Sequence, residues 1–229
     1  MIHARIDAVL TGKAVTFGPK GQPSAMHKVP RIGSLSISTL GIADDEQADL
    51  VNHGGGDKAI HHYAFDHYAT WANEQSGLAA QLASGLGQFG ENISTQGATE
   101  ADICIGDIFR LGSAIVQVSQ GRQPCWKLNT RFSWKGMAAA VQSTGRTGWY
   151  YRVLEPGTVA AGDSWSLVER PHSEFSLPRL QNALYVKMLD YNELKAIADL
   201  PALAEGWRNL ARKRLATKQV ESWNARLNG

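Results

Sequence analysis

One cysteine of this sequence stands between two cations, at a point where the chain leaves a predicted strand. Residues 113–118 alternate apolar and polar side chains, which indicates a strand. Pro124 then removes a backbone N–H and favours an extended conformation for the residue before it, so the strand ends here. Arg122 and Lys127 flank Cys125, and nearby positive charge favours a thiolate and lowers the pKa of a thiol. A thiolate suits a nucleophile or a soft-metal ligand, although a small buried thiol in a turn would give the same pattern.

A second group of candidate residues lies between positions 53 and 67, where four histidines occur. Imidazole is a common zinc ligand, but the sequence has no H-E-x-x-H pattern, so zinc is a minority interpretation. His61 and His62 are adjacent, so on a strand they point to opposite faces and only one of them can line a given pocket. The glycines after the first histidine favour a loop whose backbone amides approach an anion. That loop contains His53, Gly54, Gly55 and Lys58.

Residues 89–94 place a carboxylate, an amide and a hydroxyl in an irregular segment. Glu91, Asn92 and Ser94 could hydrogen-bond a heterocycle with several N–H and carbonyl groups. The alternative is a turn whose side chains satisfy its own backbone, and the segment alone favours that alternative. Residues 85–90 match G-x-G-x-x-G, but a dinucleotide site needs a strand before the glycines and a helix after them. A helical stretch precedes them here, so the sequence indicates no nicotinamide or flavin site.

Composition excludes several classes of protein. The chain has 229 residues and a net charge of +2, which is too small to indicate nucleic-acid binding. No apolar run approaches the roughly 20 residues of a membrane span, and the first residues lack a signal-peptide core. Two cysteines are too few for a disulfide scaffold, and Cys104 lies in an apolar run that predicts a buried structural thiol. These features predict a reducing, cytoplasmic compartment.

The order of the predicted elements gives a mainly β fold with α. Many short strands separated by glycine and proline turns predict a closed barrel or a sandwich over residues 1–170. Residues 107–111 and 113–118 predict a hairpin that turns at Gly112. We expect Asp66 to cap a helix that reaches about residue 75, and Gly145 to end a helix over residues 137–143. Residues 171–229 predict a small domain of three helices, the first capped by Ser176. The basic residues of its last helix (Arg212, Lys213, Arg214 and Lys218) predict a solvated face.

Five segments in a fixed order resemble the MOSC domain, which is named for the C-terminal domain of molybdenum cofactor sulfurase. They are His-Gly-Gly-Gly-Asp-Lys-Ala at 53–59, His-Tyr at 62–63, Phe-Gly-Glu-Asn-Ile-Ser at 89–94, Gly-Asp-Ile-Phe at 106–109 and Arg-x-Pro-Cys-x-Lys-Leu at 122–128. The resemblance is closest to the YiiM-type subgroup and covers nearly the whole chain. It implies a MOSC-type β-barrel followed by the small three-helix domain.

The resemblance also implies a molybdenum cofactor, with Cys125 as the protein ligand to the metal. Arg122 and Lys127 would offset negative charge on the cofactor, and the loop from His53 to Lys58 would close over the site. The residues that would recognise the pterin are Glu91, Asn92 and Ser94. The resemblance also implies pyridoxal phosphate binding, but only as a property of the family as a whole.

Members of this family reduce N-hydroxylated compounds, including N-hydroxylated purine analogues. By resemblance, the reaction consumes two electrons and two protons and yields the amine and water, with His62 or Asp57 relaying protons. No site for an electron-supplying cofactor is visible, so a separate reductase is implied. The C-terminal helices, with exposed basic residues, are a candidate docking surface for it. The alternative is a non-catalytic cofactor carrier or sulfur-transfer module, although this sequence lacks the pyridoxal-dependent domain of the sulfurases. The oligomeric state is open, and a homodimer is one option.

Overall fold

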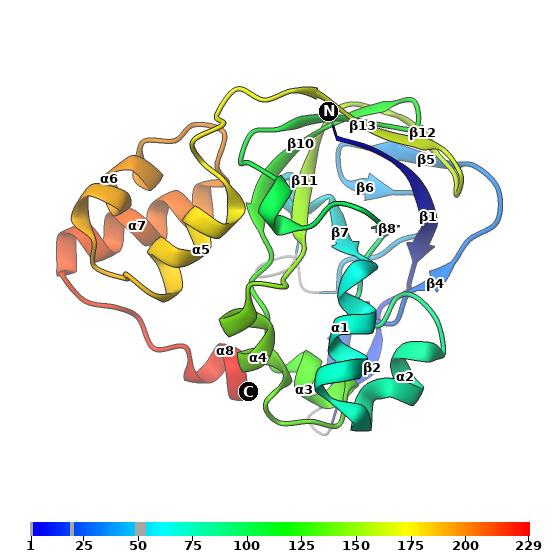
Figure 1. The fold of residues 1–229 in the computed structure, drawn as a ribbon, viewed down its shortest axis with the longest axis horizontal. Helices are drawn as coiled ribbons and strands as arrows, with labels where there is room; N and C mark the ends of the chain where they lie inside the picture. Colours follow the sequence, from blue (N-terminus) through cyan, green and yellow to red (C-terminus); the bar gives the residue numbers. More distant parts are fainter. Residues whose placement is uncertain (1, 19–20, 49–53) are drawn as a thin grey trace.

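Seven strands close into a barrel in the computed structural model, which describes residues 2–18, 21–48 and 54–229. The strand order is β13-β9-β10-β11-β7-β8-β1, and β13 pairs with β1 to complete the circle (Figure 1). All neighbours are antiparallel except β7 and β8. The barrel strands are His3–Thr11 (β1), Ile60–Ala64 (β7), Ile93–Thr95 (β8), Ile108–Leu111 (β9), Ala114–Gly121 (β10), Trp149–Glu155 (β11) and Ser164–Glu169 (β13).

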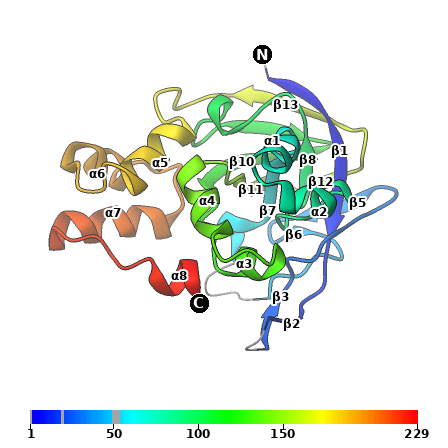
Figure 2. The same ribbon diagram turned by 60° about the horizontal axis from the view of Figure 1, so that its bottom comes forward.

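The remaining strands extend the barrel locally. Val29–Pro30 (β4) pairs with the end of β1, and Leu35–Ser38 (β5), Gly41–Ile42 (β6) and Gly157–Val159 (β12) form a small three-stranded sheet. Val15–Phe17 (β2) and Gln22–Ser24 (β3) form a hairpin that projects from the barrel (Figure 2). The prediction of a barrel is therefore confirmed, and the predicted turn at Gly112 joins β9 to β10 with a positive φ of 60°.

Aromatic side chains fill the barrel. The rings of Phe109 and Trp165 stack with centroids 4.5 Å apart, and the ring of Trp149 lies 6.3 Å from that of Trp165. All three side chains are fully buried, and rings of this size dominate the apolar area that a core removes from water. The alternation of inward and outward residues along each strand therefore decides which side chains remain available for a site outside this core.

Four helices cover one side of the barrel over a second apolar cluster. They are Asp66–Glu74 (α1), Ala79–Ala83 (α2), Lys127–Arg131 (α3) and Met137–Thr144 (α4). Gly145 ends α4 in a left-handed conformation, as predicted. The predicted cap by Asp66 is wrong, because its carboxylate accepts a hydrogen bond from the Gly97 N–H instead of from the first turn of α1. Residues 85–90 lie between α2 and β8, so the strand–turn–helix order of a dinucleotide site does not occur there.

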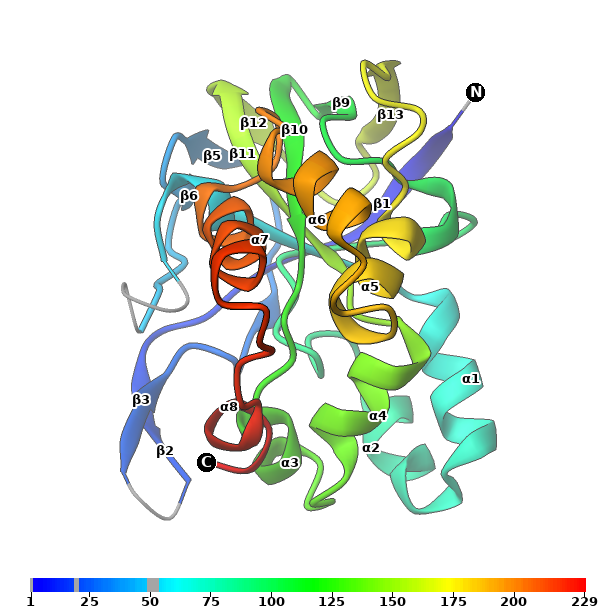
Figure 3. The ribbon, with the colours of Figure 1, turned by 90° about the vertical axis from the view of Figure 1, so that its left-hand side faces the viewer.

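The C-terminal helices share one core with the barrel. Leu177–Tyr185 (α5), Tyr191–Ala198 (α6) and Glu205–Thr217 (α7) pack beside the barrel, and Asn224–Asn228 (α8) follows after an extended segment (Figures 1 and 3). Ser176 caps α5 by accepting from the Arg179 N–H, as predicted. The proposed boundary at residue 170 lies between the last barrel strand and α5, but one apolar cluster runs from Trp149 to Leu180 and Trp207. The change at this boundary is one of secondary structure and leaves the core continuous.

Two further observations concern the helices. Arg214 is wrongly predicted to lie on a solvated face: its side chain is 0% exposed and pairs with Glu221. Among the described residues, every helix is too short or too polar to cross a lipid bilayer.

Candidate functional site

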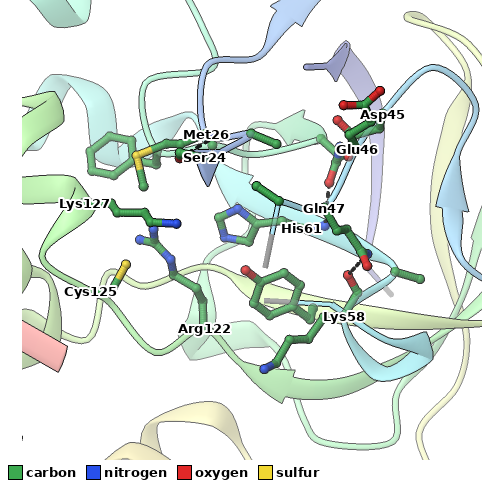
Figure 4. Close-up of a pocket in the computed structure, with 17 residues that line it drawn as sticks. Ser24, Met26, Asp45, Glu46, Gln47, Lys58, His61, Arg122, Cys125 and Lys127 are labelled. Carbon is green, nitrogen blue, oxygen red and sulfur yellow. Dashed lines mark hydrogen bonds between the residues drawn. The ribbon is translucent and has the colours of Figure 1, made fainter. Parts of the chain in front are cut away.

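A cavity of about 90 Å³ lies where β10 gives way to α3, and Cys125 is part of its wall. We call it the cysteine cavity. Its walls come from segments far apart in the sequence: residues 24–26 and 45–48, the strands β7 and β11, the turn before β8, and residues 122–127. Figure 4 shows the Cys125 sulfur beside the side chains of Arg122 and Lys127, with His61 across the cavity. The structure therefore brings the predicted thiol and its two predicted cations together.

Cys125 occupies the short connection between the end of β10 at Gly121 and the start of α3 at Lys127. Its thiol is outside any disulfide, and the residue is 7% exposed. Both interpretations of Cys125 hold in part. The thiol is buried, as expected for a small thiol in a turn, and charged side chains share its cavity, as expected for a reactive or metal-binding thiol. Cys104, by contrast, is buried as predicted, its thiol lies 3.5 Å from the Ser173 carbonyl oxygen, and burial raises its pKa.

The two cations beside Cys125 are buried and differ in their partners. The Lys127 amino group donates to the Pro23 carbonyl oxygen at 2.8 Å. The Arg122 guanidinium has one nitrogen, Nη1, that is buried and has no hydrogen-bond partner within the described part of the chain. A buried donor on a charged group is costly to leave unsatisfied, so this nitrogen marks a place where an anion would be stabilised.

His61 reaches the cysteine cavity from β7, opposite Tyr150 on β11. The two residues pair across the strands, and their ring centroids lie 4.9 Å apart. Burial lowers the pKa of His61 to about 3, and the positive charge of Arg122 adds to the effect, so the imidazole is neutral at pH 7. Its Nε2 atom is buried without a hydrogen-bond partner among the described residues. Burial raises the pKa of Tyr150, and a hydrogen bond to Arg122 opposes that rise.

His62, predicted as a proton relay, lies on the opposite face of β7 and points into the barrel. Its Nδ1 atom lies 3.0 Å from the Tyr151 hydroxyl and its Nε2 atom 2.9 Å from the Thr95 hydroxyl. It is fully buried beside Trp149 and Trp165 and does not line the cysteine cavity. This placement corrects the prediction, because both ring nitrogens are already used in the core. The signal was present in the sequence: Ile60 and Ala64 share the face of His62, so that face is the apolar one.

The wall formed by residues 45 and 92 is a closed polar network. Asp45 pairs with Lys28 and also accepts from the Gly12 N–H at 2.8 Å. Asn92, one of the predicted cofactor-binding residues, lines the cavity, but its amide donates to Asp45 and to the Leu10 carbonyl oxygen and accepts from the His61 N–H. Asn92 therefore positions His61. The buried pair between Lys28 and Asp45 could not be predicted from the sequence, because 17 residues separate its members.

Glu91 and Ser94 lie outside the cysteine cavity, so their predicted contact with a pterin is corrected. The Glu91 carboxylate accepts from the Tyr68 hydroxyl at 2.5 Å and from the N–H groups of Gly87 at 2.8 Å and Phe89 at 3.0 Å. This is the alternative interpretation of the segment, a turn that satisfies its own backbone. Ser94 is fully buried within β8.

A second hollow of about 550 Å³ lies between the barrel and the C-terminal helices, and we call it the barrel–helix groove. Gly54, Gly55 and Asp57 line the groove and not the cysteine cavity, whereas Lys58 lines both. The Asp57 carboxylate pairs with Arg152 at 2.7 Å. His53 lies outside the described residues. The glycine loop, which includes the short helix Gly56–Lys58, therefore stands at the boundary between the two hollows.

Comparison with known proteins identifies the family of this chain. The MOSC domain profile matches residues 49–166, and the profile of the YiiM-like 3-alpha helix domain matches residues 176–218. The chain belongs to the MOSC domain family. The match spans the histidines of β7, the segment at 89–94 and the connection that carries Cys125.

Individual relatives cover the chain to different extents. Protein YiiM of Escherichia coli is 38% identical over 221 residues, which are 96% of this chain and 97% of YiiM. The crystal structure of YiiM from Escherichia coli matches with a TM-score of 0.84 over the whole of both chains. A protein of Gibberella moniliformis named "Reductase" is 35% identical over 84% of this chain, but the match covers only 34% of that protein. The fungal protein therefore has a large part with no counterpart here.

The donor set of the cysteine cavity can be compared with what a molybdenum cofactor needs. One soft sulfur, the unpartnered Arg122 nitrogen and the Lys127 ammonium suit a metal with soft ligands and an anionic cofactor. Among the described residues, no three His, Cys, Asp or Glu side chains form a metal-binding group. The cavity is smaller than the roughly 300–1,000 Å³ of ordinary ligand pockets, so most of a pterin would have to occupy the adjoining groove.

Proposed function

We propose that this chain is a molybdenum-cofactor-dependent reductase of N-hydroxylated compounds, such as N-hydroxylated purine bases. The observation that carries the proposal is a reduced, buried cysteine that shares a cavity with Lys127 and with an Arg122 nitrogen lacking a partner. Membership of the MOSC family supports the cofactor, and the relative named as a reductase supports the class of reaction.

Within this proposal each side chain of the cysteine cavity has a task. The Cys125 thiolate would bind the metal, and Arg122 and Lys127 would hold the negative charge of the cofactor. Neutral His61 would place an unprotonated ring nitrogen, Nε2, in the wall of the buried site. The cofactor, when bound, would supply the two-electron chemistry that removes oxygen from nitrogen. His61 replaces His62 as our candidate for proton transfer.

Lys58 and the barrel–helix groove would receive the substrate and the rest of the cofactor. The groove is lined by the amide side chains of Gln120 and Gln123 and by the indole of Trp223. Amides offer both donors and acceptors, and an indole offers a flat apolar surface, so the groove suits a planar heterocycle that carries hydrogen-bonding groups.

Electrons would come from a separate reductase. Residues 85–90 lack the strand–turn–helix order of a dinucleotide site, and this chain matches only 34% of the fungal relative. The exposed basic side chains of α7, Arg212 and Lys213, form our candidate docking surface. Reversing both charges should weaken electron delivery by a protein donor and leave turnover with a chemical reductant unchanged; equal losses with both donors would reject this surface.

The experiment that tests the function uses protein made in a host that synthesises the cofactor. Metal analysis by mass spectrometry should find molybdenum, and a hydroxylamine with reduced viologen should be turned over to the amine. Cys125→Ser should lose both the metal and the turnover. Bound molybdenum without turnover would favour the cofactor carrier or sulfur-transfer module, and protein without molybdenum would reject both.

A further inference from the structure

The last helix, α8, lies against the connection that carries Cys125. The Arg226 guanidinium donates through Nη1 to the Pro124 carbonyl oxygen at 2.6 Å, and the Trp126 N–H donates to the Arg226 carbonyl oxygen at 2.7 Å. One residue therefore holds the peptide groups immediately before and after Cys125. Figure 3 shows α8 beside α3, although nearly a hundred residues of chain separate them.

Further contacts fix α8 to the helices next to the cysteine cavity. The second terminal nitrogen of Arg226 donates to the Gln142 side chain on α4 at 2.6 Å. The Asn129 side chain on α3 donates to the Leu227 carbonyl oxygen at 2.7 Å. Hydrogen bonds that involve a guanidinium are about twice as strong as neutral ones, so Arg226 is the principal anchor of α8.

The segment before α8 is held at its other end by the helical unit. Glu221 accepts two hydrogen bonds from the fully buried Arg214 of α7, at 3.0 and 2.6 Å, and a third from the Trp223 indole at 2.8 Å. Trp223 also packs edge-on against Tyr185 of α5, with centroids 5.6 Å apart. Residues 219–229 thus connect α5 and α7 to the Cys125 connection, and they lie outside both family profile matches.

We propose that α8 is the element that positions Cys125, with Arg226 as the positioning residue. Residues 122–126, between the end of β10 and the start of α3, belong to neither element, so regular secondary structure supplies few of their hydrogen bonds. Arg226 supplies the donor for the Pro124 carbonyl oxygen and the acceptor for the Trp126 N–H. Inside a sheet, neighbouring strands would supply both. The importance of the clamp for turnover rests on the proposed function, whereas the clamp itself can be tested on protein without cofactor.

Hydrogen exchange in the full-length chain tests the clamp directly. Arg226→Gln removes the charged anchor, and Arg226→Lys keeps the charge but cannot reach both of its acceptors. Both variants weaken the attachment of α8, so the amide of Trp126, which donates to the main-chain carbonyl oxygen of residue 226, should exchange roughly tenfold to a hundredfold faster, the factor expected for loss of one hydrogen bond to a charged group. Alkylation of Cys125 by iodoacetamide should also be faster in Arg226→Lys, where the retained charge keeps the electrostatics similar. Cys104 serves as the internal control and should react at the rate it has in the unmodified protein.

Arg212→Gln is the matched control, because it removes an exposed guanidinium from the same helical unit without touching the Cys125 connection. It should leave exchange at Trp126 unchanged. A chain that stops at Trp223 removes both clamp hydrogen bonds and should give the largest effect. Unchanged exchange at Trp126 in Arg226→Gln and in this shortened chain would overturn the proposal. Faster exchange that extends equally to β9 and β10 would also count against it, because it would report opening of the whole barrel.

Discussion

Arg122 brings a charge into the cysteine cavity that the described residues satisfy only in part. Its Nη1 atom is buried without a partner, and its charge also lowers the pKa of neighbouring His61. Residues of this kind carry a stability cost that a bound anion removes, because desolvation of the charge has already taken place. The cavity is therefore preorganised for a negatively charged group.

Arg122→Gln tests this interpretation. The variant keeps a hydrogen-bond donor but loses the charge, so under the proposed function the affinity for the molybdenum cofactor should fall roughly tenfold to a hundredfold. The measurement is the molybdenum content of purified protein over a dilution series. Arg31→Gln, which removes an exposed guanidinium paired with Asp44, is the control and should keep its molybdenum. Equal molybdenum in the two variants would contradict the role of Arg122.

His61 predicts a dependence of stability on pH. Because burial lowers its pKa to about 3, the unfolded chain binds a proton that the folded chain refuses between about pH 6.5 and pH 3. Stability contributed by the neutral ring is thus complete above pH 6.5 and falls with decreasing pH, by at most about 1.4 kcal/mol per pH unit. Burial lowers the pKa of His62 as well, so the two effects add.

Chemical denaturation at pH 7 and pH 5 measures this effect. His61→Gln should lose less stability between the two pH values than the unmodified protein does, because the contribution of His61 is removed. Identical losses in the two proteins would show that His61 takes up a proton in the folded state near its ordinary pKa.

At the scale of elements, Gly148 lies next to two residues of the cysteine cavity, Arg122 and His61. Its carbonyl oxygen accepts from the Arg122 N–H at 3.0 Å, and its N–H donates to the buried carboxylate of Glu100 at 2.5 Å. A Cβ atom here would lie against the His62 carbonyl oxygen and 2.8 Å from His61 Nε2, and the φ of 72° is one that side chains rarely adopt. Gly148, which directly precedes β11, therefore restricts the positions of both His61 and Arg122.

Gly148→Ala should lower the free energy of unfolding by about 2 kcal/mol or more, since strain and overpacking add. Gly162→Ala is a matched control: its φ is 89°, but nothing lies within 4 Å of the added carbon, so only the strain remains. Urea denaturation of the two variants separates the terms. Equal destabilisation would show that the residues around Gly148 move to accommodate the added carbon without a further loss of stability.

The sequence predicted most elements because their signals are local. The turn at Gly112, the cap at Ser176 and the helix end at Gly145 each follow from one or two residues, and the structure has all three. The misplaced residues depend on distant partners. Asp66 accepts a hydrogen bond from the Gly97 N–H and Glu91 accepts one from the Tyr68 hydroxyl, and both donors are distant in the sequence. The cysteine cavity was predicted only around Cys125, where its residues are also neighbours in sequence.

At the scale of the whole molecule, the barrel and α5–α7 share one apolar core. The indole of Trp207 on α7 is buried, and its ring lies next to Gly121 at the end of β10. The helices therefore complete the apolar core of the barrel beside the Cys125 connection. No periodicity of the sequence shows which face of the barrel a following helix will cover, so this arrangement could not be predicted.

Trp207→Ala tests the unity of the core. Loss of a buried indole should cost about 3–5 kcal/mol, and it should lower the stability of barrel and helices together. Far-UV circular dichroism and hydrogen exchange of β9 and β10 report the two parts separately, and both should show a single transition at a shifted midpoint. Two separated transitions would show that the helices fold as an independent domain.

The pairing of β1 with β13 has a consequence for synthesis of the protein on the ribosome. His3 of β1 pairs with Ser166 of β13, so β1 cannot form this pairing until β13, the last barrel strand, has been synthesised. Until then β1 and β9 are open edges, and the nascent sheet lacks Trp165 from its interior. A growing chain held before β13 should bind chaperones and be cut readily by proteases, and release of a few more residues should end both.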